Sequence, residues 1–254
     1  MTKFAFLFIV QLLVINISNL LYANPMSKNN SDLAHNNELY EGPAFQKAFN
    51  NPVDHPDRPN VLLIGDSISI GYTVPTRKLL AGKVDVFRVP SNGKHSEFGA
   101  KNLKKWLGDR HWDLVHFNWG LWDICYRHPE SKNQGHRDKI NGKLTTTPEQ
   151  YKANLKQIIK ILKNNTQAKL IWANTTPVPD HELGRIKGDE IHYNNIAQQL
   201  MLKNKISIND LHQHASKKQA QIQKAKGDVH FTPAGYQYLA EQVAFSIEQA
   251  IEAD

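Results

Sequence analysis

From residue 60 onward, the sequence alternates short continuous apolar runs with longer segments that carry apolar residues at helical spacing. Such runs are typical of strands that are buried on both faces of a sheet. Five of them are present, at residues 61–65, 84–89, 114–119, 169–173 and 206–210. A repeat of strand and helix predicts parallel strands joined by right-handed crossovers, with helices on both faces of the sheet. The sequence therefore predicts an α/β fold built as one domain.

Two of the intervening helices carry strong start signals. Thr147, Pro148 and Gln150 predict a capping box with proline in the first helical turn. Thr232 and Pro233 begin the last helix in a similar way. The other gaps are filled by helical segments at residues 96–107 and 190–205.

The chain begins with a segment that resembles an export signal. Lys3 precedes the apolar run FAFLFIVQLLVINIS, and the small residue Ala23 supplies a cleavage point, so residues 1–23 are predicted to form a signal peptide. An uncleaved membrane anchor is the alternative, but the run is short for a spanning helix and polar residues interrupt it. We therefore expect a mature protein that is secreted or periplasmic and has no stable association with a membrane.

Residues 24–58 are rich in Asn, Pro, Ser and Asp and have no sustained periodicity. This composition is typical of a flexible leader. We expect at most a short helix at 43–50, packed loosely on the domain, which is predicted to span residues 59–254. Cys125 is the only cysteine, which excludes an intramolecular disulfide and favours a bacterial exported protein over a eukaryotic one.

The net charge of +7 is compatible with an anionic partner, but many exported proteins are basic. No basic–aromatic module is present in the sequence, so no nucleic-acid partner is expected. The densest pair of histidines, His212 and His214, lacks the spacing of a zinc site. We therefore expect no metal and no cofactor.

The first apolar run stops abruptly in the sequence LIGDSIS, residues 63–69. In an open parallel sheet, ligands bind beyond the carboxyl ends of the strands, at the point where the strand order reverses. Ser67 follows the first strand directly, so its hydroxyl is expected at such a crevice. The tripeptide Gly-Asp-Ser alone leaves two interpretations open: Ser67 caps the following helix, or it is a nucleophile.

The segment GDVHFTPAGY, residues 227–236, favours the second interpretation. It places Asp228 and His230 in the loop before the final helix, which also lies at the carboxyl edge of the predicted sheet. A histidine with a pKa near ~6.5 can take the proton of a serine hydroxyl at neutral pH, and a carboxylate can orient and stabilise the imidazole. The residue types that a nucleophilic serine needs therefore come together from opposite ends of the sequence.

LIGDSIS together with GDVHFTPAGY resembles the GDSL/SGNH hydrolases, whose four sequence blocks contribute Ser, Gly, Asn and His. The resemblance runs from about residue 60 to the end, and it implies ester hydrolysis by a three-layer, flavodoxin-like α/β/α sandwich with a parallel five-stranded sheet. Ser67 matches the nucleophile and His230 the base. Asp228 lies two residues before His230, where the family has three, so either Asp228 or a backbone carbonyl orients the histidine. The G-x-S-x-G elbow of the α/β-hydrolases is absent, because Ser69 stands in place of its second glycine.

The two middle blocks depart from the family pattern. In SNGKHSEFG, Gly93 matches the glycine whose backbone N–H helps to bind the oxyanion, although a turn at Asn-Gly explains this residue as well. In NWGLWD, residues 118–123, Trp122 occupies the place of the family's asparagine. The oxyanion hole is therefore expected to consist of Ser67, Gly93 and Asn118, with the indole N–H of Trp122 as the alternative to Asn118.

Substrate-binding residues are expected beside the nucleophile. They are Asp66, Trp119 and Trp122, although a tryptophan near a strand either stacks on a sugar ring or packs in the core. The irregular stretch 125–144 is predicted to be a functional or mobile loop. Its basic side chains, which suit an anionic or hydroxylated substrate or are simply solvated, are Arg127, His128, His136, Arg137 and Lys139.

The predicted function is that of an exported serine esterase. The expected substrate is a small-molecule or polysaccharide ester, in which an acetyl or other acyl group is carried by a carbohydrate. Two alternatives remain open: a lipid esterase or thioesterase, which needs an apolar acyl channel, and a catalytically silent carbohydrate-binding relative.

Overall fold

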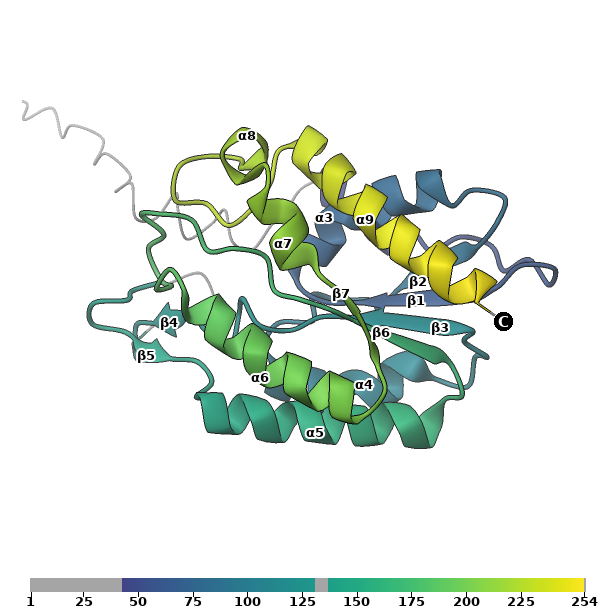
Figure 1. Ribbon diagram of the computed structural model, residues 1–254, viewed down its shortest axis with the longest axis horizontal. Coiled ribbons are helices and arrows are strands. Elements are labelled where there is room, and N and C mark those ends of the chain that lie inside the picture. The colour runs from purple at the N-terminus through teal and green to yellow at the C-terminus, as the bar shows by residue number, and fades with distance from the viewer. Residues whose placement is uncertain (1–42, 131–136, 254) are drawn as a thin grey trace, which may run out of the picture.

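A sheet of five parallel strands forms the centre of the protein, as Figure 1 shows. The structure is a computed structural model that describes residues 43–130 and 137–253. In chain order the strands of this sheet are β1 (Asn60–Ile64), β2 (Asp85–Arg88), β3 (Leu114–Phe117), β6 (Lys169–Ala173) and β7 (Ser207–Asn209). Their spatial order is β2-β1-β3-β6-β7, and every neighbouring pair is parallel. The predicted flavodoxin-like sheet is confirmed.

Helices cover both faces of this sheet, which completes the predicted three-layer sandwich (Figure 1). One face carries α2 (Pro43–Phe49), α3 (Ser67–Leu79), α7 (Leu211–Ser216), α8 (Gln219–Ile222) and α9 (Pro233–Glu252). The other face carries α4 (Ser96–Leu107), α5 (Pro148–Asn165) and α6 (Asp189–Lys203). The predicted capping box at Thr147 is present, and Thr232 caps α9 by accepting a hydrogen bond from the N–H of Gly235. No helix in the described ranges has both the length and the apolar character that a membrane span requires.

The strands are buried because helices lie on both of their faces. Val61, Leu62, Leu63 and Ile64 of β1 are each at most 2% exposed. Full burial of such a side chain stabilises the fold by roughly 1.5–3 kcal/mol relative to exposure. The chain passes from β1 to β2 on one side and then returns to β3 on the other, so the strand order reverses beside β1. The crevice that this reversal creates lies at the carboxyl end of β1, where the Gly-Asp-Ser turn begins.

The segment before β1 is tied to the edge of the sheet. The side-chain amide of Asn51 donates to the carbonyl of Arg88 at 3.1 Å and accepts from the N–H of Arg88 at 2.8 Å. The ring and backbone N–H of His55 lie 2.7–3.0 Å from the carboxylate of Asp85. The prediction of a loosely packed flexible leader is therefore wrong for residues 43–58, because strand β2 supplies hydrogen-bond partners that the sequence pattern does not reveal.

Helix α2 confirms the short helix predicted at 43–50. The predicted signal peptide, residues 1–23, and the rest of the leader, residues 24–42, lie outside the described residues.

The stretch 125–144 contains a short antiparallel hairpin, formed by β4 (Tyr126–Arg127) and β5 (Lys143–Leu144). In Figure 1 this hairpin lies at the end of the molecule opposite the C-terminus. Arg137 is 6% exposed, and its Nη1 donates to Glu182 Oε1 at 2.8 Å. Arg137 is therefore part of a buried ion pair and is not a solvated loop residue; His136 lies outside the described residues.

Candidate active site

The turn that follows β1 places Ser67 at the first residue of helix α3. The helix cap is Asp66, whose Oδ1 accepts a hydrogen bond from the N–H of Ile68 at 2.9 Å. The interpretation of Ser67 as the cap is therefore wrong. Asp66 is 1% exposed, and its carboxylate satisfies the end of the helix, so the structure gives it a capping role, and its binding of substrate stays a prediction.

Two consecutive hydrogen bonds join the side chains of Ser67, His230 and Asp228. Ser67 Oγ lies 2.9 Å from His230 Nε2, although the two residues are 163 positions apart in the chain. His230 Nδ1 lies 2.6 Å from Asp228 Oδ1, which also accepts the backbone N–H of His230 at 3.0 Å. The carbonyl of His230 accepts the N–H of Lys224 at 2.9 Å, which anchors the loop before α9.

Asp228 controls the orientation of the imidazole. Burial raises the pKa of its carboxyl, but the hydrogen bond and the charge of His230 outweigh this effect, so the pKa lies below its usual value. The carboxylate is thus ionised at neutral pH and favours the tautomer in which His230 carries its proton on Nδ1. In that tautomer the lone pair of Nε2 is the acceptor in the hydrogen bond with the hydroxyl of Ser67. Ser67 is 3% and His230 0% exposed, so their hydrogen bond is shielded from water.

The predicted oxyanion donor Gly93 serves another purpose. Its N–H donates to the carbonyl of Gly65 at 2.9 Å, and is therefore not available to an oxyanion. A Cβ at position 93 would lie 2.8 Å from that carbonyl oxygen, which explains why a glycine stands there. The N–H of Ser67, by contrast, has no acceptor within residues 43–130 and 137–253.

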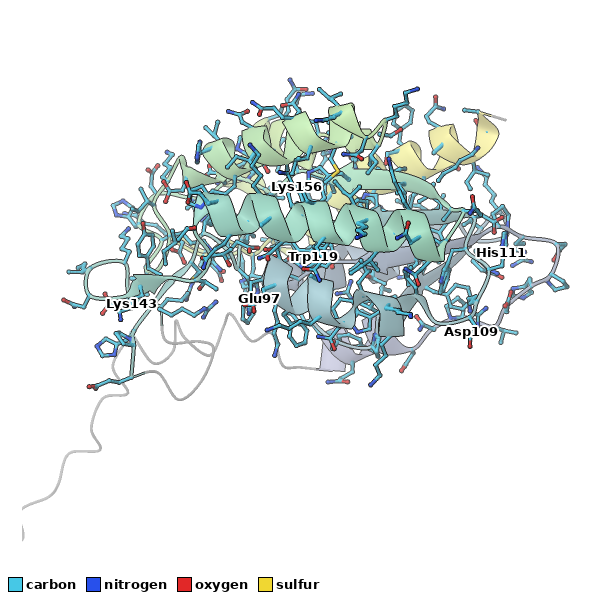
Figure 2. All side chains as sticks on the ribbon, turned by 90° about the horizontal axis from the view of Figure 1, so that it is seen from below. Glu97, Asp109, His111, Trp119, Lys143 and Lys156 are labelled. Carbon is cyan, nitrogen blue, oxygen red and sulfur yellow. The ribbon has the colours of Figure 1, made fainter. Side chains whose placement is uncertain are left out.

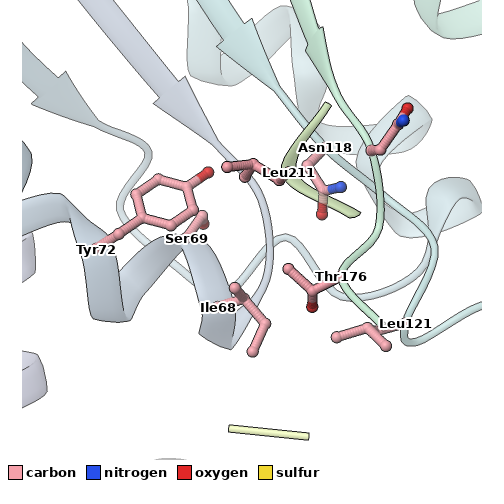
Figure 3. A pocket seen from close by; sticks show the side chains of 8 residues that line it. Ile68, Ser69, Tyr72, Asn118, Leu121, Thr176 and Leu211 are labelled. Atoms are coloured by element: carbon pink, nitrogen blue, oxygen red, sulfur yellow. The ribbon is translucent and has the colours of Figure 1, made fainter. Parts of the chain in front are cut away.

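The side-chain amide of Asn118 makes a structural hydrogen bond. Its Nδ2 donates to the carbonyl of Ala173 at 2.7 Å. Figure 3 shows its side chain at a small internal cavity of about 10 Å³, together with Ile68, Ser69 and Thr176. One of the two N–H groups of the Asn118 amide thus binds the end of β6, and donation by Asn118 to an oxyanion stays a prediction.

Trp122, the alternative donor, is 3% exposed. Its indole N–H is buried and has no hydrogen-bond partner in the described part of the chain. The guanidinium of Arg127 lies 4.5 Å from the ring centroid and covers one face of the indole. The ring is therefore covered, so stacking of Trp122 on a sugar is wrong for this structure.

Trp119 belongs to the core. It is 0% exposed, and its Nε1 donates to the carbonyl of Gly93 at 3.0 Å. The hydroxyl of Tyr151 donates to the carbonyl of Trp119 at 2.8 Å, which ties it to α5, beside which it lies in Figure 2. The prediction that Trp119 stacks on a substrate is wrong, since helix packing covers the ring completely.

Comparison with known proteins identifies the fold. No protein-family model and no curated protein matches the sequence. Among solved structures, an acetyl xylan esterase aligns with a TM-score of 0.60 at 17% identity, over 74% of this chain and 99% of that one. A lipase/acylhydrolase from Enterococcus faecalis aligns with a TM-score of 0.59 at 18% identity, over 75% and 96%. A GDSL-like lipase from Bacteroides thetaiotaomicron aligns with a TM-score of 0.55 at 16% identity, over 87% and 98%. The chain has the GDSL/SGNH hydrolase fold.

The sequence pattern did not single out one residue that lies beside the Gly65-Asp66-Ser67 turn of this GDSL/SGNH fold. Arg88, at the end of β2, is 2% exposed and donates to the carbonyl of Gly65 at 2.9 Å. The available signal was a charged residue at the carboxyl end of the apolar run 84–89. Within the described ranges no group of three His, Cys, Asp or Glu side chains is arranged to hold a metal ion.

An apolar cavity of about 360 Å³ lies between α3 and the start of α9. Ile70, Gly71 and Val74 line it from α3, and they follow Ser67 at the spacing of one helix face. The cavity therefore extends along the face of α3 that begins with Ser67. Its remaining lining residues are Phe45, Pro75, Lys224, Phe231, Pro233 and Tyr236.

Proposed function

We propose that the protein is an exported serine hydrolase that cleaves carboxylic esters, with an acetyl or other acyl ester of a carbohydrate as substrate. This proposal rests on the two hydrogen bonds that connect Asp228 to His230 and His230 to Ser67. Two of the structures that share the fold are acetyl xylan esterases, which supports the choice of substrate. The signal-like residues 1–23 support export.

In the proposed reaction, Ser67 Oγ attacks the ester carbonyl while His230 Nε2 takes the hydroxyl proton. The resulting imidazolium is stabilised by the ionised Asp228. Collapse of the tetrahedral intermediate breaks the bond to the alcohol, which leaves with the proton from His230. Water then attacks the acyl-enzyme, His230 takes its proton, and Ser67 is released with the carboxylic acid.

The negative charge of the tetrahedral intermediate needs hydrogen-bond donors. We assign the backbone N–H of Ser67 and the indole N–H of Trp122, because both lack an acceptor in the described part of the chain. Donors that are fixed before the reaction cost no reorganisation when the charge develops. An indole N–H would then replace the asparagine amide of the family.

Replacement of Trp122 by Phe tests this assignment. The Phe ring keeps apolar contacts and a surface for Arg127, but it removes the N–H. We expect the kcat for p-nitrophenyl acetate to fall by about 100-fold with little change in KM, because the lost hydrogen bond forms only in the transition state. Steady-state kinetics at neutral pH measures both constants.

Trp172→Phe is the matched control. Trp172 is 0% exposed and also has a buried indole N–H without a partner in the described ranges, but it lies within strand β6. Its replacement should leave kcat near the wild-type value. Equal losses of kcat in both variants, or none in Trp122→Phe, would remove Trp122 from the oxyanion hole.

A second candidate function, hydrolysis of lipid esters or thioesters, is favoured by the apolar cavity beside α3. A panel of p-nitrophenyl esters from acetate to decanoate, together with acetylated xylan, separates the two candidates. We expect the highest kcat/KM on acetate and release of acetate from xylan. If the cavity binds the acyl chain instead, decanoate will be preferred, and Val74→Trp, which fills the cavity, will reduce decanoate turnover by about 10-fold while sparing acetate.

A further inference from the structure

Arg88 is a buried cation that forms no ion pair with a carboxylate in the described ranges, although the nearby charge of Asp66 acts to raise its pKa. It is 2% exposed, and no ion pair joins it to a carboxylate in residues 43–130 or 137–253. Burial lowers the pKa of its guanidinium to about 10, so the group stays charged at neutral pH. A buried charge is unfavourable unless hydrogen bonds compensate for the lost water. The partners of Arg88 therefore show what this charge acts upon.

Those partners lie mainly in or beside the nucleophile turn, which is the segment Gly65-Asp66-Ser67 between β1 and α3. Arg88 Nη2 donates to the carbonyl of Gly65 at 2.9 Å and to that of Asp66 at 3.4 Å. Its Nη1 donates to Ser69 Oγ at 2.7 Å, and Ser69 Oγ in turn donates to the carbonyl of Asp66 at 2.8 Å. The guanidinium thus holds, directly and through Ser69, the two carbonyls that immediately precede Ser67.

The carbonyl of Asp66 and the N–H of Ser67 belong to the same peptide unit. In a planar trans peptide these two groups point in opposite directions, so a fixed carbonyl also fixes the direction of the N–H. A cation that binds the carbonyl further polarises the peptide and makes its N–H a stronger donor. Contacts on one side of this peptide therefore determine the donor on its other side.

We propose that Arg88 is a positioning residue that aims and strengthens the N–H of Ser67 as an oxyanion donor. This inference rests on the proposed function, and it adds a residue from outside the motifs of the nucleophile and the histidine. Arg88 acts through the Asp66–Ser67 peptide and does not touch the substrate. Loss of the guanidinium should consequently lower kcat and leave KM nearly unchanged.

Arg77 supplies a matched control because it links the same elements without contacting the turn. It lies on α3 and donates from Nε to the carbonyl of Val86 at 2.8 Å. Its other donors reach the carbonyl of Asn50 at 3.0 Å and Oδ1 of Asn51 at 2.9 Å. A purely structural arginine between α3, β2 and the segment before β1 should behave like Arg77.

The experiment compares Arg88→Met, Arg88→Lys and Arg77→Met in p-nitrophenyl acetate hydrolysis, with the melting temperature of each measured. We expect kcat to fall by roughly 10- to 100-fold in Arg88→Met and by less in Arg88→Lys, since an ammonium cannot reach all three oxygens. KM should stay within about twofold in both. Arg77→Met should keep kcat even where its melting temperature falls. If Arg88→Met does not fold, Arg88→Lys carries the test.

A second readout does not depend on activity. In Arg88→Lys, the NMR resonance of the Ser67 backbone amide should shift, whereas Arg77→Met should leave it in place. An unchanged Ser67 amide together with wild-type kcat in Arg88→Lys would overturn the inference, as would an equal loss of kcat in Arg77→Met. Absence of esterase activity in the wild-type protein would instead defeat the proposed function, and the amide shift would then decide the positioning role.

Discussion

Ser67→Ala and His230→Ala should each lower the kcat for p-nitrophenyl acetate by at least about 1,000-fold. The reason is that neither side chain works alone. The hydroxyl of Ser67 is a good nucleophile only when a base takes its proton, and the base here is His230 Nε2, which lies 2.9 Å from Ser67 Oγ. The double variant should be little worse than either single variant, because the second substitution removes a group that has already lost its partner. Steady-state kinetics and the melting temperatures of the three variants test this.

A covalent serine reagent adds a direct test of the nucleophile. A fluorophosphonate should label wild-type protein at Ser67 alone, and Ser67→Ala should not react. Ser246→Ala is a suitable control, because this serine lies on α9, and its hydroxyl is buried without a partner in the described ranges. Wild-type activity in a folded Ser67→Ala variant would end the proposal of a serine hydrolase, and absence of labelling in the wild-type protein would favour the silent carbohydrate-binding relative.

The main elements of the fold were predictable because their signals are local. Continuous apolar runs identified every strand of the central sheet to within two residues at each end. The threonine caps identified the starts of α5 and α9. The hairpin of β4 and β5 was not predicted, because each strand has two residues and no periodicity can appear over that length. The ordered segment before β1 was missed for a different reason: its stability comes from contacts with β2, which are distant in sequence.

The site was predictable only in part, for the same physical reason. Ser67, Asp228 and His230 each follow a strand or precede a capped helix, so the topology alone brings them to one edge of the sheet. The direction of a hydrogen bond is not a property of topology. The N–H of Gly93 faces the carbonyl of Gly65 and is not available for the role that its position in the motif indicated. One N–H of the Asn118 amide is likewise used by the carbonyl of Ala173.

Replacement of Asp228 by Asn should lower kcat by roughly 1,000- to 10,000-fold, although the side chain keeps its size. The carboxylate accepts from His230 Nδ1 at 2.6 Å, whereas an amide can present its NH₂ group there and favour the tautomer that carries the proton on Nε2. That tautomer cannot take a proton from Ser67. Asp180→Asn is the control, since Asp180 pairs with Lys187 at the surface. A loss below about tenfold in Asp228→Asn would mean that another acceptor orients His230.

The pH dependence of kcat/KM and of stability follows from the pair of Asp228 and His230. The pKa of Asp228 lies below its usual value because the bond and the charge of His230 outweigh burial, so the carboxylate is already ionised wherever the histidine changes its charge. The fall of kcat/KM toward acid pH should therefore have the slope of a single proton, which belongs to His230. A group with a lowered pKa stabilises the fold above its unfolded pKa, about 3.9 for Asp, and loses this contribution as the pH falls further. Asp228→Asn should consequently narrow the difference in melting temperature between pH 7 and pH 3. In the kinetic experiment, an acid limb of kcat/KM with a slope of two would show that Asp228 titrates together with the histidine.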